Sequence, residues 1–318
     1  MSIKRNIGKL LELGPIGATK ILFHKFFWEK GFATFEKLGL HVLPVHFYSP
    51  VPDTRQLRRN LHQWNKDWDF TGIDFKEDQQ IQLLQNLSKF KREYSALAEY
   101  DVIERMGLGE GYGEVESHIL YGIIRHFRPK RIIEVGSGIS TYYSITALRK
   151  NKDKEHIDSK MICIEPFPRK SLLKLVDNSR IELVPGFLQD SNLEPFKTLK
   201  ENDILFIDSS HIAKINSDVY HLYLEILPNL NSGVIIHIHD IPFPHITPDD
   251  VEHWIFQKHQ FWNESAILKA FLSFNNSFEI LLCSSYLHYK KSEILFSTFS
   301  IYNKEKHFPT AIWLRKSN

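Results

Sequence analysis

The segment Arg131–Thr141, with the sequence RIIEVGSGIST, constrains the fold of this chain more than any other stretch. Isoleucine and valine dominate its start, a proline precedes it and Gly136 follows, which is typical of a short buried strand. Gly136 and Gly138 allow a sharp turn whose backbone approaches a ligand closely. Ser140 or Thr141 can then cap a helix. The segment therefore predicts a strand, a glycine loop and a helix, the unit at which α/β domains bind nucleotide-like cofactors.

The glycine loop discriminates between cofactors. A dinucleotide site would read G-x-G-x-x-G, but Thr141 occupies the place of the third glycine, and the chain contains no G-x-x-x-x-G-K-S/T sequence of a P-loop. With Glu134 near the end of the strand, the sequence EVGSG resembles motif I of class I S-adenosylmethionine (SAM)-dependent methyltransferases. This resemblance implies that the loop binds SAM.

The composition indicates a globular protein and gives no argument for a nucleic-acid partner. Apolar residues make up 42% of the 318 residues, enough for a full core. Lys and Arg number 40 against 38 Asp and Glu, and this balanced charge, a net +2, gives no argument for binding DNA or RNA. Cys163 and Cys283 lie in apolar runs without metal-ligand spacing, which favours buried thiols in a reducing compartment. We therefore expect a cytoplasmic protein.

The chain shows no sequence pattern for membrane insertion. No run of about 18 apolar residues predicts a transmembrane helix, and no signal peptide is expected. Residues 16–35 combine many aromatic residues with Lys20, Lys25 and Lys30. Such a segment forms either a helix on a membrane surface or, as we favour, an amphipathic helix docked on the main domain. The oligomeric state is not indicated.

From residue 131 onward, short apolar runs alternate with helical patterns. This alternation predicts a mostly parallel sheet with helices on both faces, and the direct connection between the last two strands suits an antiparallel final strand. We expect a loop over residues 284–308. Strands are expected at 131–135, 160–165, 180–184, 203–207, 233–239, 278–283 and 309–315, and helices near 115–127, 141–150, 169–177, 193–200, 213–227 and 263–274.

Such an arrangement is the Rossmann-like α/β architecture of class I methyltransferases, a seven-stranded, mostly parallel sheet with an antiparallel last strand. A mainly helical or irregular N-terminal region precedes it. Residues 1–105 are expected to form this accessory region, as part of a substrate pocket or lid, and residues 106–318 the SAM-binding domain. Within the first region, Leu43–Pro52 holds three prolines and is expected to be extended.

Several polar residues are placed to bind the cofactor. Glu165 ends the second strand, where a carboxylate accepts hydrogen bonds from ribose hydroxyls, although NAD sites use the same device. Gln189 and Asp190 follow the third strand, where methyltransferases of this type contact the adenine. Glu134 faces either the site or the helix layer, and Glu116 is a weaker candidate for the methionine end. The predicted cofactor-binding residues are Glu134, Gly136, Ser137, Gly138, Ser140, Thr141, Glu165, Gln189, Asp190 and Asp208.

Two polar clusters follow the fourth and fifth predicted strands. The sequence DILFIDSSH ends at His211, and GVIIHIHD ends at Asp240. Because open α/β sheets bind ligands at the carboxyl ends of neighbouring strands, Asp208, His211, His239 and Asp240 can converge. Carboxylates with an imidazole suit Mg, Mn or Fe, a metal lowers the pKa of a bound hydroxyl, and a histidine can accept its proton. Alternatively, Asp208 contacts the methionine part of SAM or caps a helix without any metal.

The D-S-S-H sequence and the acidic end of the fifth strand resemble the metal-dependent sugar O-methyltransferases of macrolide biosynthesis. That family uses an Asp-x-x-His, with the Asp as metal ligand and the His as base, and an acidic pair on the next strand. The resemblance implies that Asp208 and Asp240 bind a metal and that Asp208 and His211 are catalytic, with His211 as the base. His239 stands where the family has Glu, so we keep it as a ligand and leave the identity of the metal open.

Four further sequences widen the resemblance to nearly the whole chain. PVHFYSPVPD, IDSSH, HIHDI and WNE are similar to sequences of a bacterial group of methyltransferase-domain proteins often linked to polysaccharide gene clusters. The prediction is a metal-assisted, SAM-dependent O-methyltransferase that acts on a sugar hydroxyl of a surface glycan or glycosylated natural product. The alternatives are an NAD-dependent oxidoreductase, a non-catalytic module that binds SAM or a glycan, and a metal-dependent hydroxylase, since His239 with two Asp resembles an iron-type ligand set.

Other polar and aromatic residues near these clusters carry weaker predictions. His237 is either a partner of the metal ligands or a hydrogen-bonded core residue. Tyr112 and the glycines around it are a candidate mobile lid. Trp254 and Trp262 pack in the core or, less favoured, stack on a sugar ring.

Overall fold

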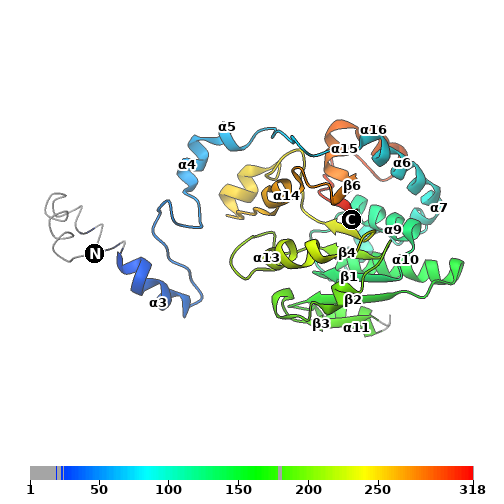
Figure 1. The fold of residues 1–318 in the computed structure, drawn as a ribbon, viewed down its shortest axis with the longest axis horizontal. Coiled ribbons are helices and arrows are strands. Elements are labelled where there is room, and N and C mark those ends of the chain that lie inside the picture. Colours follow the sequence, from blue (N-terminus) through cyan, green and yellow to red (C-terminus); the bar gives the residue numbers. More distant parts are fainter. Residues whose placement is uncertain (1–18, 20–22, 24, 178–180, 318) are drawn as a thin grey trace. The chain divides into compact units, whose positions relative to one another are not determined.

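The computed structural model of the chain describes residues 19, 23, 25–177 and 181–317. They form two compact units, one up to Trp64 and one from Asn65 onward (Figure 1). In the first unit, residues 43–52 form neither helix nor strand, and the Ser49 N–H bonds back to the His46 carbonyl at 2.8 Å, so the segment is a loop with a turn and is only partly extended. The expected helix over residues 16–35 lies partly outside the described residues, and the chain is helical over residues 25–36. The helical segments of this unit are η1 (Phe27–Gly31), α3 (Phe32–Glu36), α4 (Thr54–Arg59) and α5 (Leu61–Trp64).

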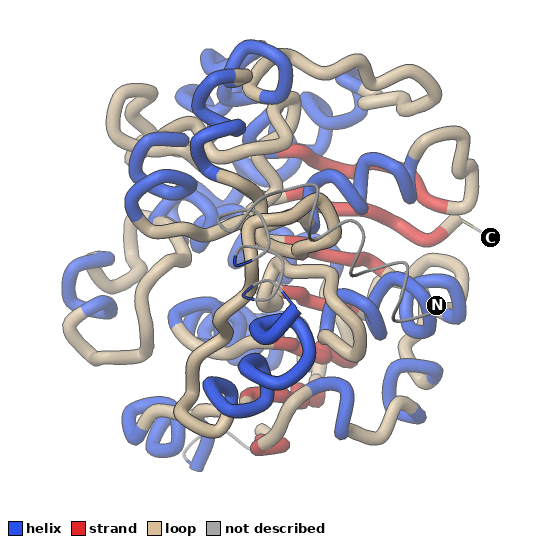
Figure 2. Tube along the Cα trace, turned by 90° about the vertical axis from the view of Figure 1, so that its left-hand side faces the viewer, coloured by secondary structure: helices blue, strands red, loops and turns tan. Residues whose placement is uncertain are grey.

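The second unit is built around a seven-stranded sheet with the order β3-β2-β1-β4-β5-β7-β6. Neighbouring strands from β3 to β5 are parallel, whereas β7 runs antiparallel to both β5 and β6. Figure 2 shows the strands stacked in one layer, and the predicted class I methyltransferase architecture is confirmed. The strands are β1 (Arg131–Val135), β2 (Lys160–Glu165), β3 (Glu182–Pro185), β4 (Ile204–Ile207), β5 (Ile235–Ile238), β6 (Phe278–Cys283) and β7 (Ile312–Lys316).

Helices and helical turns connect the strands and cover the sheet. They are α6 (Glu77–Leu87), η2 (Ser88–Phe90), α7 (Lys91–Tyr94), α8 (Tyr100–Glu104), α9 (Glu114–Phe127), α10 (Ile139–Glu155), α11 (Lys170–Asp177), η3 (Leu188–Asp190), α12 (Glu194–Lys197), α13 (Asp218–His221), η4 (Leu222–Ile226), η5 (Leu227–Asn229), η6 (Glu252–Gln257), α14 (Glu264–Leu272), α15 (Ser284–Lys290) and α16 (Ser292–Thr298). No helix among the described residues is long and apolar enough to cross a membrane.

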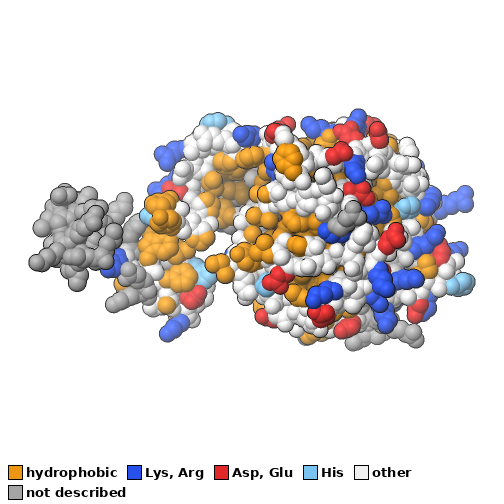
Figure 3. Space-filling model, viewed as in Figure 1, with side chains coloured by type: hydrophobic (Ala, Val, Ile, Leu, Met, Phe, Trp, Pro, Cys, Tyr) orange, Lys and Arg blue, Asp and Glu red, His pale blue; other side chains and the backbone are white. Residues whose placement is uncertain are grey.

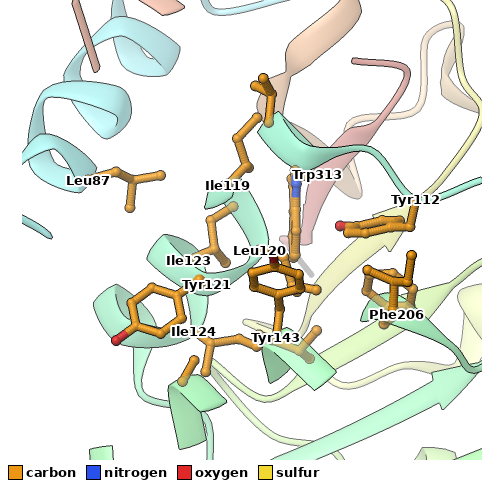
Figure 4. Close-up of a cluster of buried hydrophobic side chains, with 14 of the residues drawn as sticks. Leu87, Tyr112, Ile119, Leu120, Tyr121, Ile123, Ile124, Tyr143, Phe206 and Trp313 are labelled. Atoms are coloured by element: carbon orange, nitrogen blue, oxygen red, sulfur yellow. The ribbon is translucent and has the colours of Figure 1, made fainter. Parts of the chain in front are cut away.

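Alternate residues of each strand face opposite sides of the sheet, and each side has its own core. On one side, Ile132, Phe206 and Trp313 pack with apolar side chains of α6, α9 and α10, part of which Figure 4 shows. On the other side, Ile133 and Leu205 pack with side chains of α13, η4 and α14. Because strands buried on both faces have no polar face, they read as continuous apolar runs, which is why the sequence located most of them.

Two expectations about helices are wrong. Residues 284–308 are not a loop, because they contain α15 and α16. Each of these helices spans only about two turns, too few for a helical period to show, and such short helices depend on packing. Leu287 and Leu295 are fully buried in the core that α6 shares. The helix expected from residue 213 begins only at Asp218, where the Ser217 side chain accepts the Tyr220 N–H, so residues 208–217 remain a loop at the sheet edge.

Residues 65–105 lie in the same compact unit as the sheet. Helix α6 packs against α9, α16 and β6, and the Gln80 Oε1 accepts the backbone N–H of Cys283 at 2.8 Å. The part of the chain that forms a separate unit in the structure is therefore shorter than the accessory region of residues 1–105 that we expect from the sequence.

Candidate active site

The carboxyl ends of β1, β2, β4 and β5 meet at one edge of the sheet. The register aligns Val135 of β1 with Ile164 of β2 and Ile207 of β4, and Ile207 with Ile238 of β5. One residue further along each strand, the chain reaches Gly136, Glu165, Asp208 and His239. The inference that the fourth and fifth strands are neighbours is thus confirmed, and the sheet brings residues from four separate segments to one place.

Two glycines of the loop after β1 are required by close backbone contacts. Gly136 has a φ of +79°, and a Cβ there would lie 2.1 Å from the carbonyl oxygen of Asp208. A Cβ on Gly138 would lie 2.9 Å from the carbonyl oxygen of Leu108, which is itself buried. The glycine-rich segment before α9 therefore packs on the loop through Leu108, and Tyr112 of the same segment is buried as well.

Two cavities of about 290 and 310 Å³ flank this loop. Gly136, Glu165, Phe167 and Asp208 line both cavities, so the two form the halves of one cleft. The first half also includes Phe187, Gln189, Ser209 and Lys214, and the second includes Gly109, Tyr112, Ser137, Gly138 and Ser140. A cavity of about 510 Å³ lies along β6, and none of the predicted site residues lines it.

Glu165 is held in place by the backbone around the cleft. Its carboxylate accepts the N–H of Ser137 at 3.1 Å and the N–H of Phe167 at 2.8 Å. Gln189 lines the same half of the cleft, and its Oε1 has no hydrogen-bond partner among the described residues. Asp190 is exposed and lines neither half. The structure therefore brings Glu165 and Gln189 together at the cleft and leaves Asp190 outside it.

Glu134 faces the helix layer and not the cleft, the two possibilities that its position in the strand left open. The side chain is fully buried, and its carboxylate accepts hydrogen bonds from Ser140 Oγ at 2.8 Å, Thr141 Oγ1 at 2.5 Å and Cys163 Sγ at 3.2 Å. Burial raises the pKa of Glu134 to about 7, although the hydrogen bonds from Thr141 and Ser140 oppose the shift. Glu134 thus joins β1 to the first turn of α10 and lines neither half of the cleft.

Asp208, His211, His239 and Asp240 form a cluster beside the cleft, with one potential ligand atom from each within 4.8 Å of the others. The Nε2 of His211 lies 3.4 Å from both Asp208 Oδ1 and Asp240 Oδ2. The Nδ1 of His239 lies 3.4 Å from Asp208 Oδ1 and 3.7 Å from Asp240 Oδ2. The imidazoles are buried, whereas the carboxylate side chains remain 32% and 27% exposed, so the cluster is accessible from its carboxylate side.

The charges of the cluster perturb one another strongly. Burial alone raises the pKa of Asp208, but the neighbouring His239 and His211 hold it well below its usual range. Burial also raises the pKa of Asp240. Burial lowers the pKa of His211, but hydrogen bonds to Asp208 and Glu264 outweigh burial and raise this pKa to about 10. Burial likewise lowers the pKa of His239, but the carboxylates of Asp240, Glu116 and Asp208 raise it well above its usual value. The carboxylates therefore favour positive charge at this place, carried either by protons on the imidazoles or by a cation that replaces these protons.

Two buried glutamates, Glu264 and Glu116, lie next to the imidazole nitrogens that face away from Asp208 and Asp240. The sequence analysis did not predict that either glutamate would support a histidine of the cluster. Glu264 Oε2 lies 2.9 Å from His211 Nδ1 and accepts the Ser209 hydroxyl at 2.8 Å. Glu116 Oε1 lies 3.2 Å from His239 Nε2, without the alignment of a hydrogen bond. The one available signal for Glu264 was its place in the WNE sequence, and Glu116 was noted only as a weak cofactor ligand.

The remaining candidates are mainly packing residues. His237 stacks on Phe206 at 4.2 Å, and neither of its ring nitrogens has a hydrogen-bond partner among the described residues. Burial lowers the pKa of His237 well below its usual value, so this residue is a neutral core side chain. Trp262 lies 4.9 Å from the ring of His211 and 5.7 Å from that of Trp254, and both tryptophans are only partly buried.

Part of the chain matches a known protein family. Residues 133–241 match a protein family described as a methyltransferase domain. An uncharacterized protein of Archaeoglobus fulgidus is 28% identical over 182 residues, which are 55% of this chain and 81% of that protein.

Among solved structures, an O-methyltransferase from Bacillus cereus in complex with SAH is 13% identical, with 74% of this chain and 100% of that chain covered and a TM-score of 0.42. A TDP-rhamnose 3′-O-methyltransferase of calicheamicin biosynthesis is 12% identical, with 79% and 99% covered and a TM-score of 0.40. The sheet has the strand order of class I SAM-dependent methyltransferases, and residues 133–241, which include β1 to β5 and the glycine loop, match a methyltransferase domain.

Proposed function

We propose that the protein transfers the methyl group of SAM to a sugar hydroxyl, with the help of a divalent metal held by Asp208, His239 and Asp240. The observation that carries the proposal is that Asp208 belongs both to the metal-type cluster and to the cleft beside the glycine loop. A hydroxyl activated at the cluster would therefore lie next to a cofactor bound at the loop. Proximity of this kind is the main contribution a protein makes to methyl transfer.

The residues of the cleft fit SAM. Glu165, fixed by two backbone N–H groups, keeps lone pairs for ribose hydroxyls. Phe167 and Phe187, whose rings lie 5.6 Å apart, offer apolar surface for the adenine beside Gln189. The second half of the cleft, around Gly138, would hold the methionine part. SAM would supply a cationic methyl donor, and these residues align it.

The cluster fits a divalent cation, because two carboxylates and two imidazoles converge there without a lysine or arginine among them. Such a cation would lower the pKa of the acceptor hydroxyl, which must lose its proton before it attacks the methyl group. The sequence resemblance makes His211 the proton acceptor, a role that requires its Nε2 to be free.

The acceptor class rests on the sequence resemblance and on the aromatic surface beside the cluster. Trp262 contacts the ring of His211 and pairs with Trp254, and partly buried tryptophans offer flat apolar surface to a sugar ring. We further propose that residues 1–105 contribute to the acceptor pocket and that the enzyme acts in the cytoplasm on precursors of a surface glycan or a glycosylated natural product.

The first test is a calorimetric titration of the purified chain with S-adenosylhomocysteine and, separately, with NAD. We expect micromolar binding of S-adenosylhomocysteine and none of NAD, because the loop lacks the third glycine of a dinucleotide site. Binding of NAD alone would overturn the proposal. Absence of binding by either compound would favour a non-catalytic module that recognises the glycan.

A further inference from the structure

We infer that His211 is a fourth metal ligand instead of the catalytic base, and that the centre prefers a first-row transition cation such as Fe²⁺, Co²⁺ or Zn²⁺ to Mg²⁺. The inference rests on the proposed metal-assisted function and specifies its metal class. It departs from the sugar O-methyltransferases that the sequence resembles, in which the corresponding histidine accepts a proton.

The spacing within the cluster is that of ligands around one ion. The His211 and His239 nitrogens each face the same oxygens, Asp208 Oδ1 and Asp240 Oδ2, at 3.4–3.7 Å. Hydrogen bonds between these groups would be shorter, at about 2.7–3.2 Å. Ligand bonds of about 2.1 Å at tetrahedral angles place neighbouring ligand atoms about 3.4 Å apart. The four nitrogen–oxygen separations therefore match a shared cation better than direct pairing.

His211 presents the correct nitrogen to that cation. Its Nδ1 is 2.9 Å from Oε2 of Glu264, a side chain only 1% exposed. Because the carboxylate accepts the proton of Nδ1, Nε2 is the nitrogen that faces Asp208 and Asp240, where a cation would replace its proton. A carboxylate behind a histidine is the usual support of a metal-binding imidazole. A histidine that served as base would instead need its Nε2 free to reach the substrate.

His239 also has a buried carboxylate next to it, although this pair lacks the alignment of a hydrogen bond. Its Nε2 lies 3.2 Å from Oε1 of Glu116, and its Nδ1 points to the same two carboxylates as His211. The ring is 2% exposed, and within the described part of the chain its nitrogens make no hydrogen bond. Glu116 is in turn fixed by the N–H groups of Gly113 and Thr310, at 3.1 and 2.8 Å. A buried imidazole that faces two carboxylates without a hydrogen bond to either fits the role of a metal ligand.

The backbone is distorted to bring His211 and Asp240 into the cluster. Their φ angles are +59° and +54°, in the left-handed region that residues other than glycine rarely occupy. The carbonyl of His211 accepts the N–H groups of Asn263 and Glu264, at 3.0 and 3.2 Å. The WNE sequence thus fixes both the backbone and the ring of His211. Strain of this kind at several members of one cluster is typical of a functional site.

The donor set indicates the class of cation. Mg²⁺ prefers oxygen ligands and retains several waters, whereas imidazole suits Fe, Co and Zn. A site with two imidazoles and two carboxylates is therefore better matched to the second group. The carboxylate side chains, being partly exposed, leave room for a substrate oxygen to join the ligands.

The test measures metal binding on the full chain after removal of metal with a chelator. Calorimetry is expected to show Co²⁺ binding at least about 100-fold more tightly than Mg²⁺. In Cu²⁺-loaded protein, nitrogen hyperfine coupling in the electron paramagnetic resonance spectrum counts the bound imidazoles. We expect two in the parent protein and one in His211→Asn, a variant that keeps a polar side chain of similar shape. His211→Asn should also weaken Co²⁺ binding at least about 100-fold.

Further variants separate ligand loss from general damage. Glu264→Gln should weaken Co²⁺ binding about 10- to 100-fold while both imidazoles are still counted, because Glu264 positions a ligand and is not one. His221→Ala, in α13 outside the cluster, should bind Co²⁺ like the parent protein. Two imidazoles in folded His211→Asn, or Mg²⁺ binding as tight as that of Co²⁺, would overturn the inference. Binding of S-adenosylhomocysteine, measured on the same samples, reports separately on the proposed methyltransferase function.

Discussion

At the scale of single residues, Asp208 is the side chain that connects the cofactor cleft to the cluster. It lines both halves of the cleft and faces both imidazoles. Asp208→Asn keeps the shape of the side chain and removes the charge that a cation and His239 require. We expect methyl transfer to fall at least about 1,000-fold, in line with losses of transition-state electrostatics, and S-adenosylhomocysteine affinity to change less than about tenfold.

Asp158→Asn is the matched control for this prediction, because Asp158 is exposed and pairs with Lys152 far along the chain from the cluster. It should retain the activity of the parent protein. Single-turnover rates and calorimetric affinities measured on both variants separate chemistry from binding. Methyl transfer by Asp208→Asn at the parental rate would remove this carboxylate from the chemistry.

Glu134 gives the protein a pH-dependent stability that is independent of the cluster. Its pKa is raised from 4.5 to about 7 in the fold, so the native state binds a proton more tightly than the unfolded chain does. Its contribution is therefore fully present below pH 4.5 and is lost as the pH rises to about 7. The shift of 2.5 (7 − 4.5) corresponds to roughly 3 kcal/mol.

Glu134→Gln, which cannot titrate, should remove this part of the pH dependence. Urea unfolding between pH 4.5 and 8 should show the parent protein losing stability relative to the variant by up to about 1.4 kcal/mol per pH unit below pH 7. Above pH 7 the difference should stay constant. Parallel stability curves for the two proteins over the whole range would show that Glu134 does not titrate in this window.

At the scale of elements, Arg125 joins α9, α10 and the α6–α7 region. Its guanidinium, 3% exposed, contacts Glu93 and Glu155 at 2.8 Å each and also bonds to Asn151. Arg125→Met would leave two carboxylates without their common partner. Because these carboxylates are about one quarter exposed, water compensates in part, and we expect a loss of about 2–3 kcal/mol in the free energy of unfolding.

Lys152→Met, also on α10, is the control for the Arg125 prediction. Lys152 and its partner Asp158 are more than half exposed, and such surface pairs contribute less than about 1 kcal/mol. Chemical unfolding of both variants gives the comparison. A loss for Arg125→Met as small as that for Lys152→Met would mean that packing of α9 on α10, and not this ion-pair network, joins the two helices.

The sequence predicted elements where periodicity was strong or turn chemistry was specific. The strand from Arg131 to Val135 and the glycine loop after it could be located because both depend on local residue types. The helices α15 and α16 could not, because two-turn helices are stabilised by burial of residues such as Leu287 in a core formed by distant segments. Such contacts leave no pattern within the segment itself.

The same division applies to the site, at the scale of the whole molecule. The convergence of Asp208, His211, His239 and Asp240 followed from the strand order, which the alternation of elements predicts. The roles of Glu116 and Glu264 did not, since these residues lie on α9, before β1, and on α14, between β5 and β6, and only the packed fold places them next to the imidazoles. Residue spacing alone did not show that each histidine has a buried carboxylate on its outer side.

The two-unit organisation leads to the last prediction. The unit from Asn65 onward contains the whole sheet, both cores, the cleft and the cluster. A protein of residues 65–318 should therefore fold, with an S-adenosylhomocysteine affinity within about threefold of the full chain.

The first unit exposes Phe26, Phe47 and Tyr48, and hydrophobic side chains gather on its surface in Figure 3. Exposed apolar surface of this kind marks an interaction site, so we expect the truncation to reduce methyl transfer at least about tenfold.

Calorimetry and steady-state kinetics on the truncated and full-length proteins distinguish the roles of the two units. A higher KM for the acceptor with unchanged cofactor affinity would support a role of the first unit in acceptor recognition, because only acceptor contacts would be lost. Equal activity of the two proteins would place acceptor recognition within residues 65–318, where Trp254 and Trp262 then become its main candidates. Loss of S-adenosylhomocysteine binding on truncation would contradict the assignment of the cleft beside Gly136 as a complete cofactor site.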